Sequence, residues 1–60
     1  MNAAGPSPQL LPLTLSLVRR PGSLRAQVLE ALAEHGQPLR WAITAVAPGG
    51  ELTVEAVLLR

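Results

Sequence analysis

The side chains that could perform chemistry are few in this 60-residue chain, and their best grouping precedes a predicted helix. A helix N-terminus presents free backbone N–H groups and the positive end of the helix dipole, which together favour phosphate or carboxylate. The sequence therefore predicts a candidate anion-binding site formed by Arg19, Arg20, Gly22, Ser23 and Arg25. In the alternative interpretation Ser23 is an ordinary helix cap and the arginines are solvated.

A second candidate site is the pair Arg40 and Trp41, which would anchor a planar ligand and stack against it. Trp41 is the only aromatic residue of the chain. It shares its expected strand face with Leu39 and Ile43, so the alternative is that its ring belongs to the hydrophobic core.

Residue types for catalysis or metal binding are scarce. The chain has no Cys and no Asp, and His35 is its single histidine. A Ser-His-Asp arrangement therefore cannot form, and the four glutamates with one histidine give no dense metal-ligand set. We expect His35 to cover the edge of the core from the last helical turn. We also expect that the protein is not an enzyme and holds no metal or cofactor.

Length and composition predict one small domain that needs support from outside itself. The chain is 48% hydrophobic and 15% charged, which is typical of a globular protein. A core of this size is usually reinforced by disulfides, metals or oligomerisation, and the first two are disfavoured here. We therefore expect self-association into a homodimer or a larger homo-oligomer.

The charge and hydropathy patterns predict no nucleic-acid or membrane partner. A net charge of +1 is too small for an extensive basic nucleic-acid surface. The first basic residue, Arg19, follows the apolar run from Leu10 to Val18, whereas a signal peptide carries its positive charge before such a run. That run is also too short to cross a bilayer, so we expect a cytoplasmic protein.

The spacing of apolar residues and the positions of Gly and Pro predict the helix and the strands. Residues 1–9 are expected to form a flexible arm, and residues 10–60 a single domain. Alternating leucines from Leu11 predict a strand, Ser23 begins a helix to about His35, and two β-prone runs, 39–47 and 51–59, form a hairpin.

The hairpin register follows from matching apolar residues across a two-residue Gly49-Gly50 turn of the primed type. A three-residue loop sets Ile43 against Glu55, so the pattern disfavours it. The predicted pairs are Ala47 with Leu52, Ala45 with Val54, Ile43 with Ala56, and Trp41 with Leu58.

These elements predict an α+β fold with the order strand, helix, strand, strand. A right-handed crossover favours an antiparallel sheet of order 1-3-2 with the helix on one face. The other face lacks a cover although it carries several apolar residues. We expect it to be the homo-oligomeric interface, with the residues Val18, Ala42, Val46, Val57 and Leu59.

The functional prediction is a small, non-catalytic interaction or scaffold module that binds copies of itself. Two alternatives stay open: a small-ligand carrier that uses Arg40 and Trp41, and a weak phosphate or RNA binder that uses the helix N-terminus.

Overall fold

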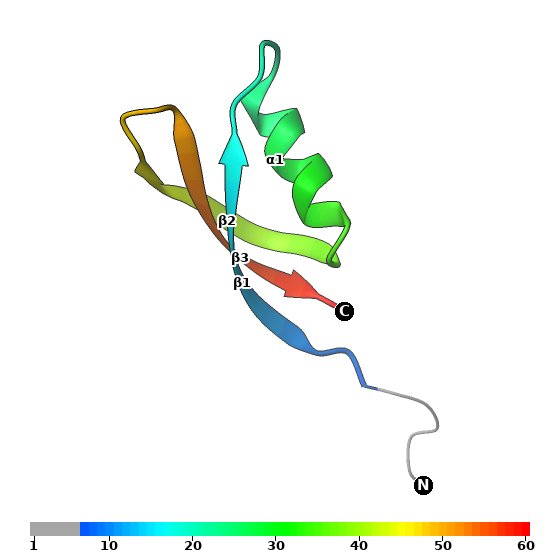
Figure 1. Ribbon diagram of the computed structural model, residues 1–60. Helices are drawn as coiled ribbons and strands as arrows, with labels where there is room; N and C mark the ends of the chain where they lie inside the picture. Colours follow the sequence, from blue (N-terminus) through cyan, green and yellow to red (C-terminus); the bar gives the residue numbers. More distant parts are fainter. Residues whose placement is uncertain (1–6) are drawn as a thin grey trace, which may run out of the picture.

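The computed structural model describes residues 7–60 and contains four elements. They are β1 (Leu10–Val18), α1 (Leu24–Ala33), β2 (Gln37–Val46) and β3 (Glu51–Leu59). The strands form one antiparallel sheet of order β1-β3-β2, with α1 beside it (Figure 1). The predicted fold class, element order and strand order are therefore confirmed.

The expected arm over residues 1–9 lies mostly outside the described residues. Gln9, which the sequence placed in that arm, belongs to the sheet: its N–H donates to the Arg60 carbonyl at 3.1 Å, and its carbonyl accepts from the Arg60 N–H at 3.0 Å.

Strand β1 pairs with β3 without interruption over nine residues. Its odd-numbered leucines lie opposite the buried residues of β3, as in the pairs Leu11 with Leu58 and Leu15 with Val54. The alternation of apolar and polar residues thus turns one row of leucines toward the core. These leucines are half-buried and pack against the core cluster.

The helix is set by its caps. The Ser23 side chain accepts a hydrogen bond from the Ala26 N–H at 3.2 Å, as expected for an N-cap. The helix ends at Ala33 with Glu34 as its C-cap, so the predicted end near His35 was slightly late. Val28 and Leu32 are fully buried against the sheet.

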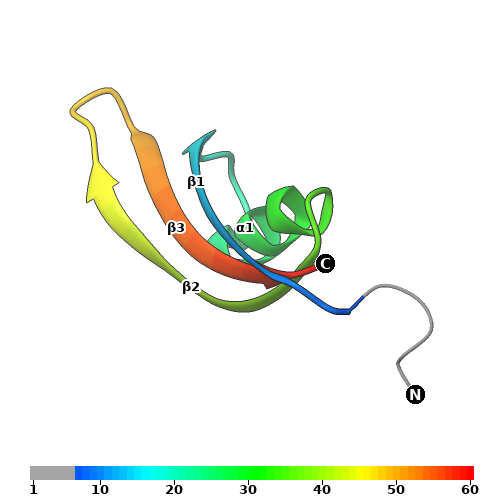
Figure 2. The same ribbon diagram turned by 90° about the horizontal axis from the view of Figure 1, so that it is seen from below.

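The core lies between α1 and the concave side of the curved sheet, which Figure 2 shows nearly edge-on. Trp41, Ile43 and the β1 leucines pack around its margin. Its fully or nearly fully buried residues come from the helix and the central strand: Val28, Leu32, Val54, Ala56 and Leu58.

The hairpin turn differs from the predicted one. The Ala47 N–H donates to the Glu51 carbonyl at 2.8 Å, and the Gly50 N–H donates to the Ala47 carbonyl at 2.9 Å, so the loop has three residues. Gly50 has a φ of 91°, whereas Gly49 does not have a positive φ. This is the three-residue loop in which a type I turn is followed by a left-handed residue. Only one of the two glycines is therefore required by the backbone.

The predicted hairpin register was also wrong. Trp41 pairs with Ala56 and Ile43 with Val54, two residues away from the expected partners on β3. A shift by two residues keeps Trp41 and Ile43 on their predicted face, so in this part of the strand the apolar pattern alone did not distinguish the two registers.

Two irregularities interrupt the β2–β3 ladder, one between Pro38 and Arg40 and one between Ile43 and Ala45. Thr44 is an extra residue in β2 that has no partner on β3, and after such a bulge the side chains of the strand change faces. The three-residue loop can therefore occur together with the apolar pairs farther along the strand, such as Ile43 with Val54. As a result Val46 lies opposite Leu52. The assignment of Val46 to the uncovered face of the sheet was therefore wrong.

Candidate functional site

No element of residues 7–60 packs on the face of the sheet turned away from α1, and we call this face the open face. Strand β3 shows the contrast between the two faces, since its residues facing the helix are buried, while those on the open face are half-buried or exposed. The open face carries Leu10, Pro12, Thr14, Ser16 and Val18 of β1, Glu51, Thr53, Glu55, Val57 and Leu59 of β3, and Arg40, Ala42 and Ala45 of β2.

Four of the five predicted interface residues lie on this face. Val57 and Leu59 are half-buried on the central strand, and Ala42 and Val18 are exposed on the strands beside it. The remaining residue, Val46, lines a separate hollow on the helix side of the sheet with Leu24 and Ile43.

Sequence reasoning missed two residues of the open face, Leu10 and Pro12. Leu10 is 66% exposed and lies opposite Leu59, while Pro12 lies opposite Val57. The signal was present: the alternation that begins at Leu11 already places Pro12 on the face that carries Val18, and extending it one residue backward places Leu10 there too.

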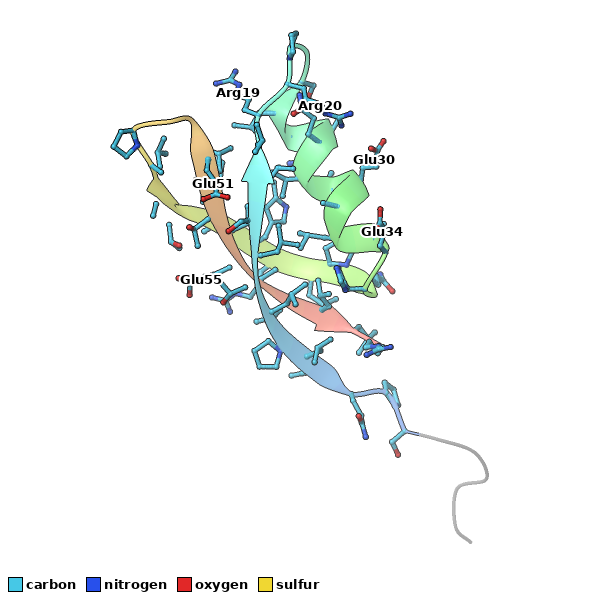
Figure 3. All side chains as sticks on the ribbon, viewed as in Figure 1. Arg19, Arg20, Glu30, Glu34, Glu51 and Glu55 are labelled. Atoms are coloured by element: carbon cyan, nitrogen blue, oxygen red, sulfur yellow. The ribbon has the colours of Figure 1, made fainter. Side chains whose placement is uncertain are left out.

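A shallow hollow lies at the centre of the open face and holds one charge of each sign. Its lining includes the exposed Arg40 and Glu55 and the smaller side chains of Ala42 and Val57. Figure 3 shows Glu51 and Glu55 on the side of the sheet away from the helix, which carries Glu30 and Glu34. Within residues 7–60 the one ion pair joins Arg20 to Glu30, so Arg40 and Glu55 are unpaired there.

The predicted ligand-stacking pair is divided between the two faces. Trp41 is half-buried and packs against the core cluster, opposite Ala56. Arg40, the preceding strand residue, lies opposite Val57 on the open face. The two side chains therefore do not form one binding site for a planar group, although both residues border the central hollow.

At the predicted anion site the helix start is capped from within the chain. The Ser23 side chain binds the Ala26 N–H, and the Ser23 carbonyl accepts from the Gln27 N–H at 3.2 Å. The Arg20 guanidinium lies 3.7 Å from the Glu30 carboxylate, with both side chains exposed. Arg19 and Arg20 leave the chain on different sides (Figure 3). Arg19 and Arg20 thus do not converge on one point.

Gln27 is the polar residue that the helical pattern misplaced. At 100° per residue the helical pattern groups Gln27 with Glu30 and Glu34, opposite the apolar residues, but Gln27 is only 8% exposed. Its Nε2 donates to the Arg20 carbonyl at 2.7 Å, and its Oε1 accepts from the Arg20 N–H at 2.8 Å. This side chain therefore fastens the β1–α1 connection to the helix, a contact between residues seven apart that helical periodicity does not reveal.

Other chemistry finds little support in the described part of the chain. His35 is exposed, which corrects the expectation that it covers the core edge. Residues 7–60 contain no group of three or more His, Cys, Asp or Glu side chains placed to hold a metal ion. Among these residues, no helix has the length and apolar character needed to cross a membrane.

The comparisons with known proteins identify a family and no activity. No curated protein and no solved structure matches the chain. One family pattern matches residues 9–60, which include all four elements of the fold. The protein therefore belongs to the family described as a domain of unknown function, DUF8621.

Proposed function

We propose that this protein is a non-catalytic module that associates with copies of itself through the open face of its sheet. The observation that carries the proposal is the contrast between the two rows of side chains on β3: the row that faces the helix is buried, while Val57 and Leu59 on the other row are half-buried and no element of residues 7–60 packs on them. A second sheet packed on that face would bury them.

The dimensions of the chain support this proposal. Its radius of gyration is 14.2 Å, compared with about 10 Å for a compact domain of this length. Its principal extents are 53, 19 and 13 Å, so the fold is long and thin. Among residues 7–60 six hydrophobic residues are buried: Val28, Leu32, Leu52, Val54, Ala56 and Leu58. Such a core gains stability when another copy covers additional apolar surface.

The charges of the open face favour a second copy as the partner. In a two-fold interface a residue that lies away from the axis meets a different residue of its partner, and the contact occurs twice. Arg40 of one chain can then pair with the partner's Glu55, and Glu55 with the partner's Arg40. The same face thus supplies both members of each ion pair, as self-complementarity requires.

The test is the replacement Val57→Glu, which places a charge at the centre of the open face. Burying this charge costs several kcal/mol, because in the proposed interface the neighbouring Arg40 already pairs with the partner's Glu55, so the open-face contact is expected to be lost while the chains stay folded. Sedimentation at micromolar concentration reports the size, and far-UV circular dichroism reports the fold.

The matched control is Val46→Glu, the same change at a valine that is 66% exposed and lies on the helix side of the sheet. It is expected to leave the size of the assembly unchanged. A wild-type protein that sediments as a folded single chain at every concentration tested would refute the proposed function.

A further inference from the structure

The free edge of β1 carries backbone groups that nothing in the described chain pairs. Because Gln9 and Arg60 exchange both of their backbone hydrogen bonds, the odd-numbered residues of this ladder direct their N–H and C=O groups to β3. The even-numbered residues consequently direct theirs away from β3, toward the edge where no strand lies. These residues are Leu10, Pro12, Thr14, Ser16 and Val18.

Pro12 occupies one of these outward positions. Proline has no N–H to donate, so it fits where the missing donor would have pointed away from the sheet. Its place in β1 therefore costs no bond to β3. The other four outward residues keep both their N–H and their C=O groups available for a further strand.

The opposite edge of the sheet, on β2, is less suited to pairing. It has two irregularities and contains Pro38, and bulges of this kind bend an edge away from a regular partner. The nine-residue pairing of β1 has no such interruption. A further strand is therefore better accommodated at β1 than at β2.

We propose that β1 pairs in antiparallel fashion with β1 of a second copy, with Thr14 opposite the partner's Thr14 on the two-fold axis. The two sheets would then join into one sheet of six strands. The proposal rests on the self-association proposed above, but it uses the strand edge rather than the open face, so the two contacts can be disrupted separately.

The side-chain pattern of β1 is symmetric about Thr14, and this symmetry selects the second copy and the register. Leu11 faces the partner's Leu17, and Leu13 faces the partner's Leu15, so the half-buried leucine row continues across the junction. On the open face Leu10 meets the partner's Val18. These two residues are 66% and 64% exposed, and the pairing covers both.

The backbone hydrogen-bonding groups of β1 favour the same register. Pairing about Thr14 sets even-numbered residues opposite even-numbered ones, which is the condition for their outward groups to meet. The two Thr14 residues exchange two hydrogen bonds, and each Ser16 N–H donates to the partner's Pro12 carbonyl. A slip by one residue sets outward groups against inward ones and turns leucines toward polar residues.

Amide hydrogen exchange tests the edge in the wild-type protein. The N–H groups of Thr14, Ser16 and Val18 are expected to be protected in the assembled protein and to lose protection on dilution. If they exchange as freely as in the unfolded chain while sedimentation shows an assembly, the edge pairing is refuted and the proposed function stands.

A mixed sample of isotope-labelled and unlabelled chains tests the register. The Cα atoms of Leu13 and Leu15 lie about 6.6 Å apart within one strand, since the rise is about 3.3 Å per residue. Across the proposed junction they form a non-hydrogen-bonded pair with Cα atoms about 4.5 Å apart. A strong interchain Hα–Hα cross-peak between Leu13 and the partner's Leu15 is expected, and its absence from an assembled sample would overturn the register.

Thr14→Pro separates the edge from the open face. It removes the two central edge bonds without removing a bond to β3, and it is expected to weaken pairing on the order of tenfold. The control Thr14→Val keeps the N–H and should associate like the wild type. If Thr14→Pro assembles like the wild type, the edge proposal is refuted. If Val57→Glu assembles like the wild type while Thr14→Pro does not, the open-face contact is refuted and the edge stands.

Discussion

The two ladders of the sheet, β1 with β3 and β2 with β3, share a central strand but differ in regularity. The first keeps one register over nine residue pairs, whereas the second shifts register twice. In β1 a leucine at every second position sets the pairing, and no turn connects this strand to β3. In β2 the pairing must also satisfy the three-residue loop at the hairpin end. A tight hairpin turn and the pairing of apolar residues across two strands can therefore favour different registers. A β-bulge between them lets one hairpin contain both registers.

Deleting one residue from each strand is the strongest way to contrast the ladders. Deletion of Thr14 shifts one half of β1, so two of its leucines turn to the open face whichever half moves. We expect a loss of about 2 to 4 kcal/mol in the free energy of unfolding, a large part of the stability of a chain this small.

Deletion of Thr44 in β2 is expected to have a much smaller effect. Removing this residue makes the ladder continuous, with Ala45 still opposite Thr53 and Ile43 still opposite Val54. The unfolding free energy should change by less than about 1 kcal/mol. Urea denaturation of both variants at equal protein concentration measures the contrast. Equal losses from the two deletions would show that Thr44 is not a dispensable bulge residue.

The loop that causes the irregular ladder gives the second contrast. Gly50 has a φ of 91°, which a β-branched residue resists, so Gly50→Val should cost about 1 to 3 kcal/mol. Gly49 does not have a positive φ, and an added Cβ there meets no atom within 4 Å. Gly49→Val should therefore be the milder change. Thermal unfolding of the two variants measures the difference, and equal melting temperatures would contradict the assigned loop.

The third contrast concerns the connection that follows the regular ladder. Gln27→Ala removes the two hydrogen bonds that hold the Arg20 backbone, and it should cost about 1 to 2 kcal/mol. Glu30→Ala breaks only the exposed ion pair with Arg20 and should cost less than about 0.5 kcal/mol. Urea denaturation compares the two variants. A larger loss from Glu30→Ala would mean that the ion pair, and not the amide, secures the connection.

Much of the fold was predictable because it rests on local patterns. Alternation in β1, the Ser23 cap and the Gly and Pro positions each act over a few residues, and right-handed crossover limited the sheet to few arrangements. The open face followed from the same alternation, and four of its five proposed contact residues lie where expected. The self-association for which they were proposed is a prediction that sedimentation will test.

The amino-acid sequence is sufficient to predict which side chains share each face of β1 and β3, because the two-residue period of a strand does not depend on its neighbours. The pairing of β2, the face of Val46 and the burial of Gln27 were established only by the folded structure. Each of these features depends on segments that are separated along the chain. The pairing of β2 and the face of Val46 depend on how the hairpin loop fits with the apolar pairs between the strands, and the burial of Gln27 depends on its contact with the β1–α1 connection. Such contacts are selected by the combined free energy of the whole fold, and no single periodic pattern encodes them.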